Sequence, residues 1–215
     1  MKSDFLFELG TEELPPKALL SLSHAFTESI LDGFIAQGLS FEGSTSYAAP
    51  RRLAIYIKGL DGSTPDSDIV SWGPPARVAF DEAGAPTKAA EAFASKNNLA
   101  LSDLSAYIEN DGHQDKLCIR HTESGRASTE LFGLVINECL SSLPIPKRMR
   151  WGSSKDEFVR PVHWGVLMFG DHVCEETILG VKTGNVSQGH RFHCPGDILI
   201  KSPNSYEKQL RSAKV

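Results

Sequence analysis

The residues with the clearest chemical potential lie between Pro144 and Trp164, here called the basic segment. It holds five Lys or Arg against two acids, a charge of +3, while the other residues of the chain sum to −8. Its cations are Lys147, Arg148, Arg150, Lys155 and Arg160, and it also contains Trp151 and Trp164. Guanidinium groups beside indoles offer phosphate forks, stacking faces and cation–π contacts. This combination suits RNA or an acidic protein surface.

Ordinary packing is the alternative interpretation of the basic segment, because an Arg stem also covers an indole ring while its charged head stays in water. Pro144, Pro146 and Pro161 each fix their own φ and favour an extended residue before them, which predicts a positioned loop rather than a helix. Exposure of Arg148, Arg150 and Trp151 on a common surface would favour ligand contact. Their burial would favour packing.

Two further sets of polar residues are candidates. Arg51 and Arg52 follow Pro50 between two expected strands. Charged residues at the end of a strand are usually exposed to solvent without a function, and a functional role for this pair is the alternative. The segment 188–194 carries His190, Arg191, His193 and Cys194. We expect no metal site there because no second ligand pair has suitable spacing. A hydrolase using Cys194 with His190 or His193 would need a nucleophile and base in hydrogen-bond reach, which such close positions rarely achieve.

Composition limits the function. The 215 residues are 40% hydrophobic and 23% charged, as in a soluble globular protein, and the net charge is −5. A protein that binds nucleic acid through its whole surface is therefore excluded, and any RNA contact must be local. No apolar run suits a membrane span, and no signal peptide opens the chain, so we expect a cytoplasmic protein without membrane contact. The four cysteines form no C-x-x-C pair, which favours reduced thiols.

Hydrophobic periodicity predicts an α+β fold with a mainly antiparallel sheet and three or more packed helices. We expect helices over 15–38, 88–97 and 128–140, and strands over 4–9, 41–48, 52–60, 68–72, 162–169, 173–179 and 198–200, with a hairpin around Asp111-Gly112. Thr87 is the expected N-cap of the second helix. We divide the chain into an N-terminal α+β region, 1–140, and a β-rich region, 141–215. The helical pattern from Tyr206 reaches Val215 without a stop signal, so we expect a chain cut from a longer one.

Motifs for self-contained catalysis are not found. The sequence contains no G-x-x-x-x-G-K-[ST] loop, no G-x-G-x-x-G and no G-x-S-x-G. We therefore assign no catalytic residue and no cofactor to this chain.

Six motifs in order carry a resemblance to a known family. They are Phe7-Glu8-Leu9-Gly10-Thr11-Glu12-Glu13-Leu14-Pro15-Pro16, Ala49-Pro50-Arg51-Arg52-Leu53-Ala54, Ala79-Phe80-Asp81 with Gly84 and Pro86-Thr87, Leu143-Pro144-Ile145-Pro146-Lys147-Arg148-Met149-Arg150-Trp151-Gly152, Phe158-Val159-Arg160-Pro161-Val162-His163-Trp164 and Gly189-His190-Arg191-Phe192-His193. Together they resemble the N-terminal part of the β subunit of bacterial two-subunit glycyl-tRNA synthetase, from residue 5 to about residue 210. The family's β subunit is far longer and includes an HD-type domain and an anticodon-binding region.

The resemblance implies an α2β2 ligase that joins glycine to tRNA(Gly) with ATP. It implies that the α subunit holds ATP and glycine, while the β subunit handles tRNA. The partners would be the α subunit, tRNA(Gly) and the remaining β-subunit domains. The candidates for RNA contact or for an interface are Lys147, Arg148, Arg150, Trp151, Arg160, Arg51, Arg52, His190 and Arg191. A structural module for subunit assembly, without RNA contact, is the alternative.

The missing phosphate loop generates a first prediction. The isolated 215-residue chain should neither activate glycine nor hydrolyse ATP. Glycine-dependent pyrophosphate exchange, assayed on the purified chain with the added α subunit as the positive control, tests this. Exchange by the chain alone would contradict it.

Overall fold

The computed structural model describes residues 1–215 and contains two compact units. The first, here the sheet unit, comprises Met1–Pro65 and Arg126–Val215, and the second, the inserted unit, comprises Asp66–Gly125. The expected division at 140/141 differs from this one and falls inside the sheet unit. The physical reason is that the chain returns after residue 125, so that helix α4 (Phe132–Ser142) and strand β9 (Val162–Phe169) pack beside N-terminal elements.

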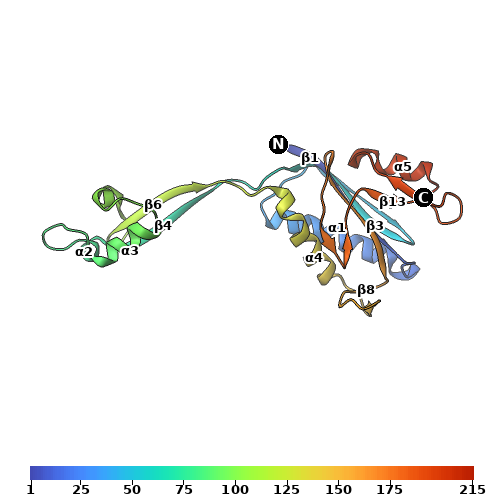
Figure 1. The fold of residues 1–215 in the computed structure, drawn as a ribbon, viewed down its shortest axis with the longest axis horizontal. Coiled ribbons are helices and arrows are strands. Elements are labelled where there is room, and N and C mark those ends of the chain that lie inside the picture. The colour runs from blue at the N-terminus through green and yellow to red at the C-terminus, as the bar shows by residue number, and fades with distance from the viewer. The chain divides into compact units, whose positions relative to one another are not determined.

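The sheet unit is built on a five-stranded antiparallel sheet of order β10-β9-β1-β3-β2 (Figure 1). Its remaining elements are β1 (Lys2–Thr11), α1 (Pro16–Ala36), β2 (Gly43–Ala49), β3 (Arg52–Asp61), η2 (Ser128–Glu130), β7 (Met149–Arg150), β8 (Glu157–Phe158), β10 (His172–Val173), β11 (Thr177–Ile178), β12 (Val181–Lys182), β13 (Val186–Gln188), β14 (Asp197–Leu199), η3 (Pro203–Ser205) and α5 (Tyr206–Ser212). The α+β class with antiparallel sheet is confirmed.

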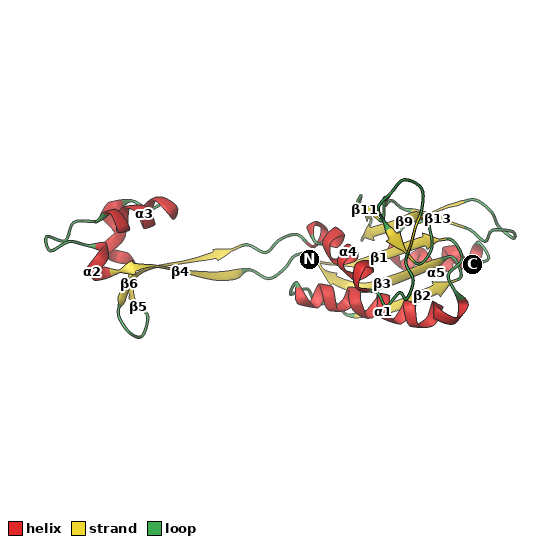
Figure 2. Ribbon diagram, turned by 90° about the horizontal axis from the view of Figure 1, so that it is seen from below, coloured by secondary structure: helices red, strands yellow, loops and turns green.

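The central strand β1 has both faces buried, and its side chains alternate between two cores. Phe5, Phe7 and Leu9 belong to the larger core, with residues of α1 and α4. Ring pairs such as Phe7 with Phe26, whose centroids lie 5.7 Å apart, consolidate this face. Leu6 belongs to a smaller core on the opposite face, with residues of α5 (Figure 2). The side chain that alternation places next on that second face is Glu8.

The expected strand over 173–179 is two short strands, β10 and β11. Thr183 fixes the bend between them. Its Oγ1 accepts the Glu176 N–H at 2.8 Å and donates to the Cys174 carbonyl at 2.8 Å. These bonds satisfy backbone groups that a continuous ladder would have paired.

The inserted unit has its own sheet and core. Its elements are β4 (Ser67–Pro75), α2 (Ala76–Ala79), α3 (Lys88–Lys96), η1 (Leu101–Tyr107), β5 (Ile108–Asn110) and β6 (Asp115–Glu123), with strand order β4-β6-β5. The hairpin around Asp111-Gly112 is confirmed. Thr87 is the N-cap residue of α3, as expected, although its hydroxyl donates to the Val78 carbonyl at 2.7 Å and makes no capping hydrogen bond to the helix. None of the chain's helices has the length and apolar character needed to cross a bilayer.

Charge is distributed unequally between the units. The inserted unit contains ten Asp and Glu against five Lys and Arg, so it is −5. The sheet unit contains seventeen of each and is balanced. The whole net charge of the chain therefore resides in the inserted unit, and the acidic composition does not describe the sheet unit's surface.

Gly10 supplies a test of the packing between β1 and β9. A Cβ at this position would lie 1.9 Å from Trp164 Cε2, so Gly10→Ala should displace the indole and destabilise the protein by about 1 to 3 kcal/mol or more. The matched control is Gly43→Ala in β2, where nothing lies within 4 Å of the added carbon. Thermal unfolding of both variants checks this, and equal midpoints would contradict it.

Candidate functional site

A buried carboxylate lies at the centre of the second face of the sheet. The Glu8 side chain is 0% exposed, and donors approach both of its oxygens. Oε1 accepts the Trp164 indole N–H and the Ser187 hydroxyl, the latter at 2.6 Å. Oε2 accepts the Tyr206 hydroxyl and one Nη1–H of Arg52, the latter at 3.3 Å. A buried carboxylate is stable only with such partners.

Arg52 is the cation of this cluster and is 5% exposed. Besides Glu8, its Nη1 donates to Ser187 Oγ at 3.0 Å, and its Nη2 donates to the Gln188 carbonyl at 2.6 Å. The expectation of a solvated strand end is wrong for Arg52. Strand β3 lies between β1 and β2, and the register that pairs Glu8 with Ala54 places Arg52 diagonally beside Glu8 on the same face. Its guanidinium is not exposed to an RNA phosphate.

Tyr206 closes the cluster from α5. Burial, followed by the charge of Glu8 and the hydrogen bond to it, raises the pKa of the Tyr206 hydroxyl well above its usual value. The hydroxyl therefore stays protonated and donates. Because every member is engaged, the cluster connects β1, β3, β9, β13 and α5 as a structural anchor and leaves no free base for catalysis.

The basic segment is not one cationic surface. Arg148 Nη2 donates to the carbonyls of Leu140, Ser141 and Leu143 at 3.2, 2.7 and 3.2 Å. These are end groups of α4, which have no partners within the helix. Arg148 therefore caps a helix, favourably for the helix dipole. Trp151 is half-buried and packs against the larger core.

The other four cations of the segment reach the surface, and Lys155 among them is exposed. Arg150 is exposed, and its Nε donates to Glu157 Oε1 at 2.6 Å. Arg160 is half-buried and donates to the Glu13 carbonyl at 3.0 Å. Lys147 is exposed and has no ion pair; with Arg160 it lines a largely apolar pocket of about 480 Å³ beside Pro144. Arg148 and Trp151 thus fit the packing interpretation, whereas Lys147 and the Nη groups of Arg150 stay available for a ligand.

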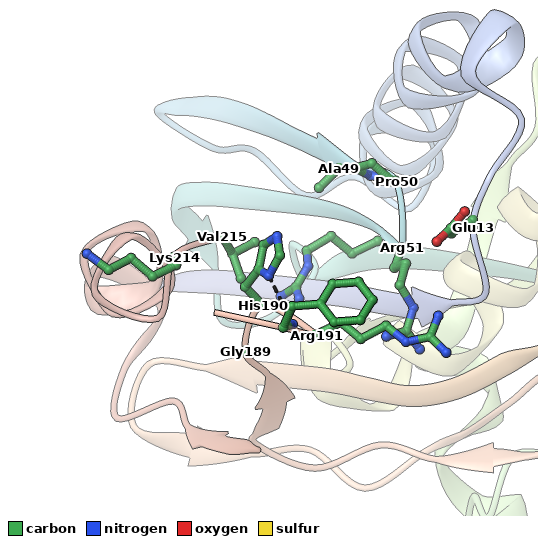
Figure 3. Close-up of a pocket in the computed structure, with 11 residues that line it drawn as sticks. Glu13, Ala49, Pro50, Arg51, Gly189, His190, Arg191, Lys214 and Val215 are labelled. Atoms are coloured by element: carbon green, nitrogen blue, oxygen red, sulfur yellow. Dashed lines mark hydrogen bonds between the residues drawn. The ribbon is translucent and has the colours of Figure 1, made fainter. Parts of the chain in front are cut away.

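Four candidates from distant parts of the sequence meet at a second pocket, of about 320 Å³, between the turn 49–51 and the loop 189–193 (Figure 3). We call it the turn–loop pocket. Figure 3 shows Arg51, His190 and Arg191 around one opening, with Pro50 on one side and Glu13 near its edge. Its lining residues are Glu13, Ala49, Pro50, Arg51, Arg52, Gly189, His190, Arg191, Phe192, Lys214 and Val215.

His190 holds the loop of this pocket in shape. Its Nδ1 accepts the backbone N–H groups of Phe192 and His193 at 3.2 and 3.1 Å, so the ring is in use as an acceptor. The Cys194 thiol makes no hydrogen bond to either imidazole, so the nucleophile–base geometry of the hydrolase alternative is not formed. In the described chain no three His, Cys, Asp or Glu side chains are grouped to hold a metal.

The comparisons with known proteins decide the family. The family model described as glycyl-tRNA synthetase beta subunit matches residues 5–215. The chain belongs to the glycyl-tRNA synthetase β-subunit family. Glycine–tRNA ligase β subunits of Marinobacter nauticus and Pseudomonas entomophila are 45% and 47% identical to it, over 97% and 99% of this chain. That of Pseudomonas fluorescens is 48% identical over 99%. The chain spans 30% of the length of each of these relatives.

Two residues that matter in this glycyl-tRNA synthetase β-subunit chain are not among the candidates predicted from its sequence. Glu8 is expected there only as part of a strand, although a charged residue amid apolar neighbours signals a buried partner. Phe192 is 81% exposed at the turn–loop pocket. The sequence feature that could have indicated Phe192 is an aromatic residue next to Arg191 in a segment that contains several Gly and Pro, which is typical of a loop.

The buried pair gives the prediction for this region. Arg52→Met should destabilise the β-subunit chain by about 3 to 5 kcal/mol, because the buried Glu8 carboxyl would lose its cationic partner. The neighbouring control is Arg51→Met, which removes a guanidinium that makes no hydrogen bond to the protein. Chemical denaturation of both variants measures the difference. Equal stability of the two would disprove the anchoring role of Arg52.

Proposed function

We propose that this chain is the N-terminal part of the tRNA-handling subunit of glycine–tRNA ligase, a cytoplasmic heterotetramer in which the α subunit binds ATP and glycine. The observation that supports this most strongly is the family match over residues 5–215. The chain's contribution to ATP-dependent glycylation would be to bind and position tRNA(Gly), with the α subunit and the remaining β-subunit domains as its protein partners.

The charge distribution supports RNA contact through the sheet unit. All nine candidate residues lie in this balanced unit, and of them Lys147, Arg150 and Arg191 are exposed. The inserted unit, at −5, would repel a phosphate backbone. RNA should therefore meet the exposed cations of the sheet unit. Arg52 and Arg148 would support these surfaces from within, because protein groups already occupy their donors.

Subunit assembly is the second candidate function, and the inserted unit favours it. Trp72 is 42% exposed, and Val70, on the same face of β4, is also exposed. Apolar side chains on an acidic unit suit a protein surface better than RNA. Both roles are compatible within one subunit, the sheet unit contacting RNA and the inserted unit contacting protein.

The RNA role predicts how the surface cations behave. In the complex of the full-length β subunit with the α subunit, Lys147→Ala with Arg150→Ala should weaken tRNA(Gly) binding and leave glycine-dependent pyrophosphate exchange unchanged. Each phosphate that is no longer bound should lower the magnitude of the slope of log K against log salt by roughly 0.7 to 0.9. Binding titrations at several salt concentrations measure this.

Arg148→Ala is the matched control, because it removes a guanidinium that caps α4. It should lower the thermal midpoint and reduce all activities with the amount of folded protein, without changing the salt slope. An unchanged slope in the Lys147/Arg150 double variant would count against RNA contact at these two residues.

A further inference from the structure

We propose that the turn–loop pocket binds one unpaired nucleotide of RNA, with its base stacked on Phe192 and its phosphate held by Arg51 and Arg191. This inference rests on the proposed tRNA-handling function and names the part of RNA that this site would take. It requires cations with free donors, an exposed ring and a cavity of the right size at one place.

The free donors are identified by comparing the arginines of the sheet unit. Arg52, Arg126, Arg148, Arg150 and Arg160 donate hydrogen bonds to protein groups, and Arg211 forms an ion pair with Glu207 at 2.7 Å. Arg51 and Arg191 are the two that make no hydrogen bond to the protein. Both line the turn–loop pocket.

Arg51 is the stronger indication of a ligand. Its Nε is buried without a hydrogen-bond partner in the chain, and its Nη2 forms only a long ion pair with Glu12 Oε1, at 3.9 Å, which is beyond hydrogen-bond range. A buried donor that is left unsatisfied destabilises the protein, because it has lost its hydrogen bonds to water. A phosphate oxygen entering the pocket would supply the acceptor and accept from the planar guanidinium fork, the geometry for which Arg is favoured at phosphate sites.

Phe192 provides the stacking surface. The side chain is 81% exposed, and the Arg191 guanidinium lies 5.9 Å from the centre of its ring. The loop that carries it is fixed by the His190 acceptor bonds and by the Gly189 N–H, which donates to the Gly196 carbonyl at 2.9 Å. A rigidly presented ring loses little conformational freedom on binding, and aromatic rings beside Arg are the usual platform for unpaired RNA bases.

The size and charge of the pocket favour a nucleotide over a protein segment. Its volume of about 320 Å³ lies at the small end of small-molecule sites. Ala49 and Pro50 give it an apolar wall, and Glu13 is the only acidic side chain among the lining residues. The lining cations that are not paired with Glu8 are Arg51, Arg191 and Lys214. A base in a duplex would first have to break its pair and leave its stack, which costs free energy, so an unpaired nucleotide is the favoured ligand.

The test uses fluorescence anisotropy on the complex of the full-length β subunit with the α subunit. The probes are a short oligouridylate, an RNA duplex of equal length and inorganic polyphosphate. Phe192→Ala should weaken oligouridylate binding by roughly 5- to 150-fold and leave polyphosphate binding unchanged, because only the base stacks. Arg51→Gln with Arg191→Gln should weaken both, and should lower the magnitude of the salt slope for oligouridylate by roughly 0.7 for each phosphate that is no longer bound.

Matched controls lie away from the turn–loop pocket. Leu20→Ala removes an exposed apolar side chain of α1, and Arg120→Gln removes an exposed guanidinium bonded to Glu109. Neither should change oligouridylate binding. Thermal midpoints of all variants establish that the measured losses come from folded protein.

Three outcomes would overturn the proposal. If Phe192→Ala bound oligouridylate normally while the arginine variant bound it more weakly, the pocket would recognise only the phosphate charge and not a base. Equal affinity for duplex and single strand would exclude an unpaired nucleotide. Loss of α-subunit association by Phe192→Ala, with RNA binding intact, would assign the pocket to a protein. In each of these cases, normal tRNA(Gly) binding by the complex would leave the proposed function intact. If the wild-type complex bound no tRNA(Gly), both the proposed function and the nucleotide site would be disproved.

Discussion

One buried carboxylate determines how the sheet unit is assembled. Glu8 lies on the central strand of the sheet, where removing a charge from water is costly, and it is tolerated because four donors converge on it. Those donors come from Arg52, Trp164, Ser187 and Tyr206, which are spread over almost the whole sheet unit. Satisfying Glu8 therefore fixes where β3, β9, β13 and α5 must lie. The same bonds place the turn 49–51 opposite the loop 189–193, and so form the turn–loop pocket.

Arginine has two uses in this chain. Arg52 and Arg148 have carboxylate or carbonyl oxygens as acceptors inside the protein, and their loss would affect folding before it affected any ligand. Arg51 and Arg191 keep their donors free beside a cavity. Arginines that look alike in sequence thus differ in whether the protein accepts their hydrogen bonds. The nucleotide site is proposed at the two whose guanidinium groups make none.

Charge separates the two units in a similar way. The balanced sheet unit can present local cations to phosphate, whereas the inserted unit holds the entire net negative charge together with exposed apolar side chains. A subunit that binds RNA with one unit and protein with another would need this division.

Local patterns in the sequence were enough to predict most of the secondary structure, the α+β class and the family. Periodicity specifies helices such as Pro16–Ala36, and runs such as Phe5 to Leu9 specify strands, because side-chain alternation is encoded over a few residues. No such pattern reveals which cations are free. Arg51 and Arg52 are adjacent and both line the pocket, yet only Arg52, on β3, has the register that brings its guanidinium to Glu8. Arg52 finds further partners more than 100 positions away, whereas the Arg51 guanidinium makes no hydrogen bond to the protein. That difference arises only on folding, because burial and hydrogen-bond partners are properties of the packed chain.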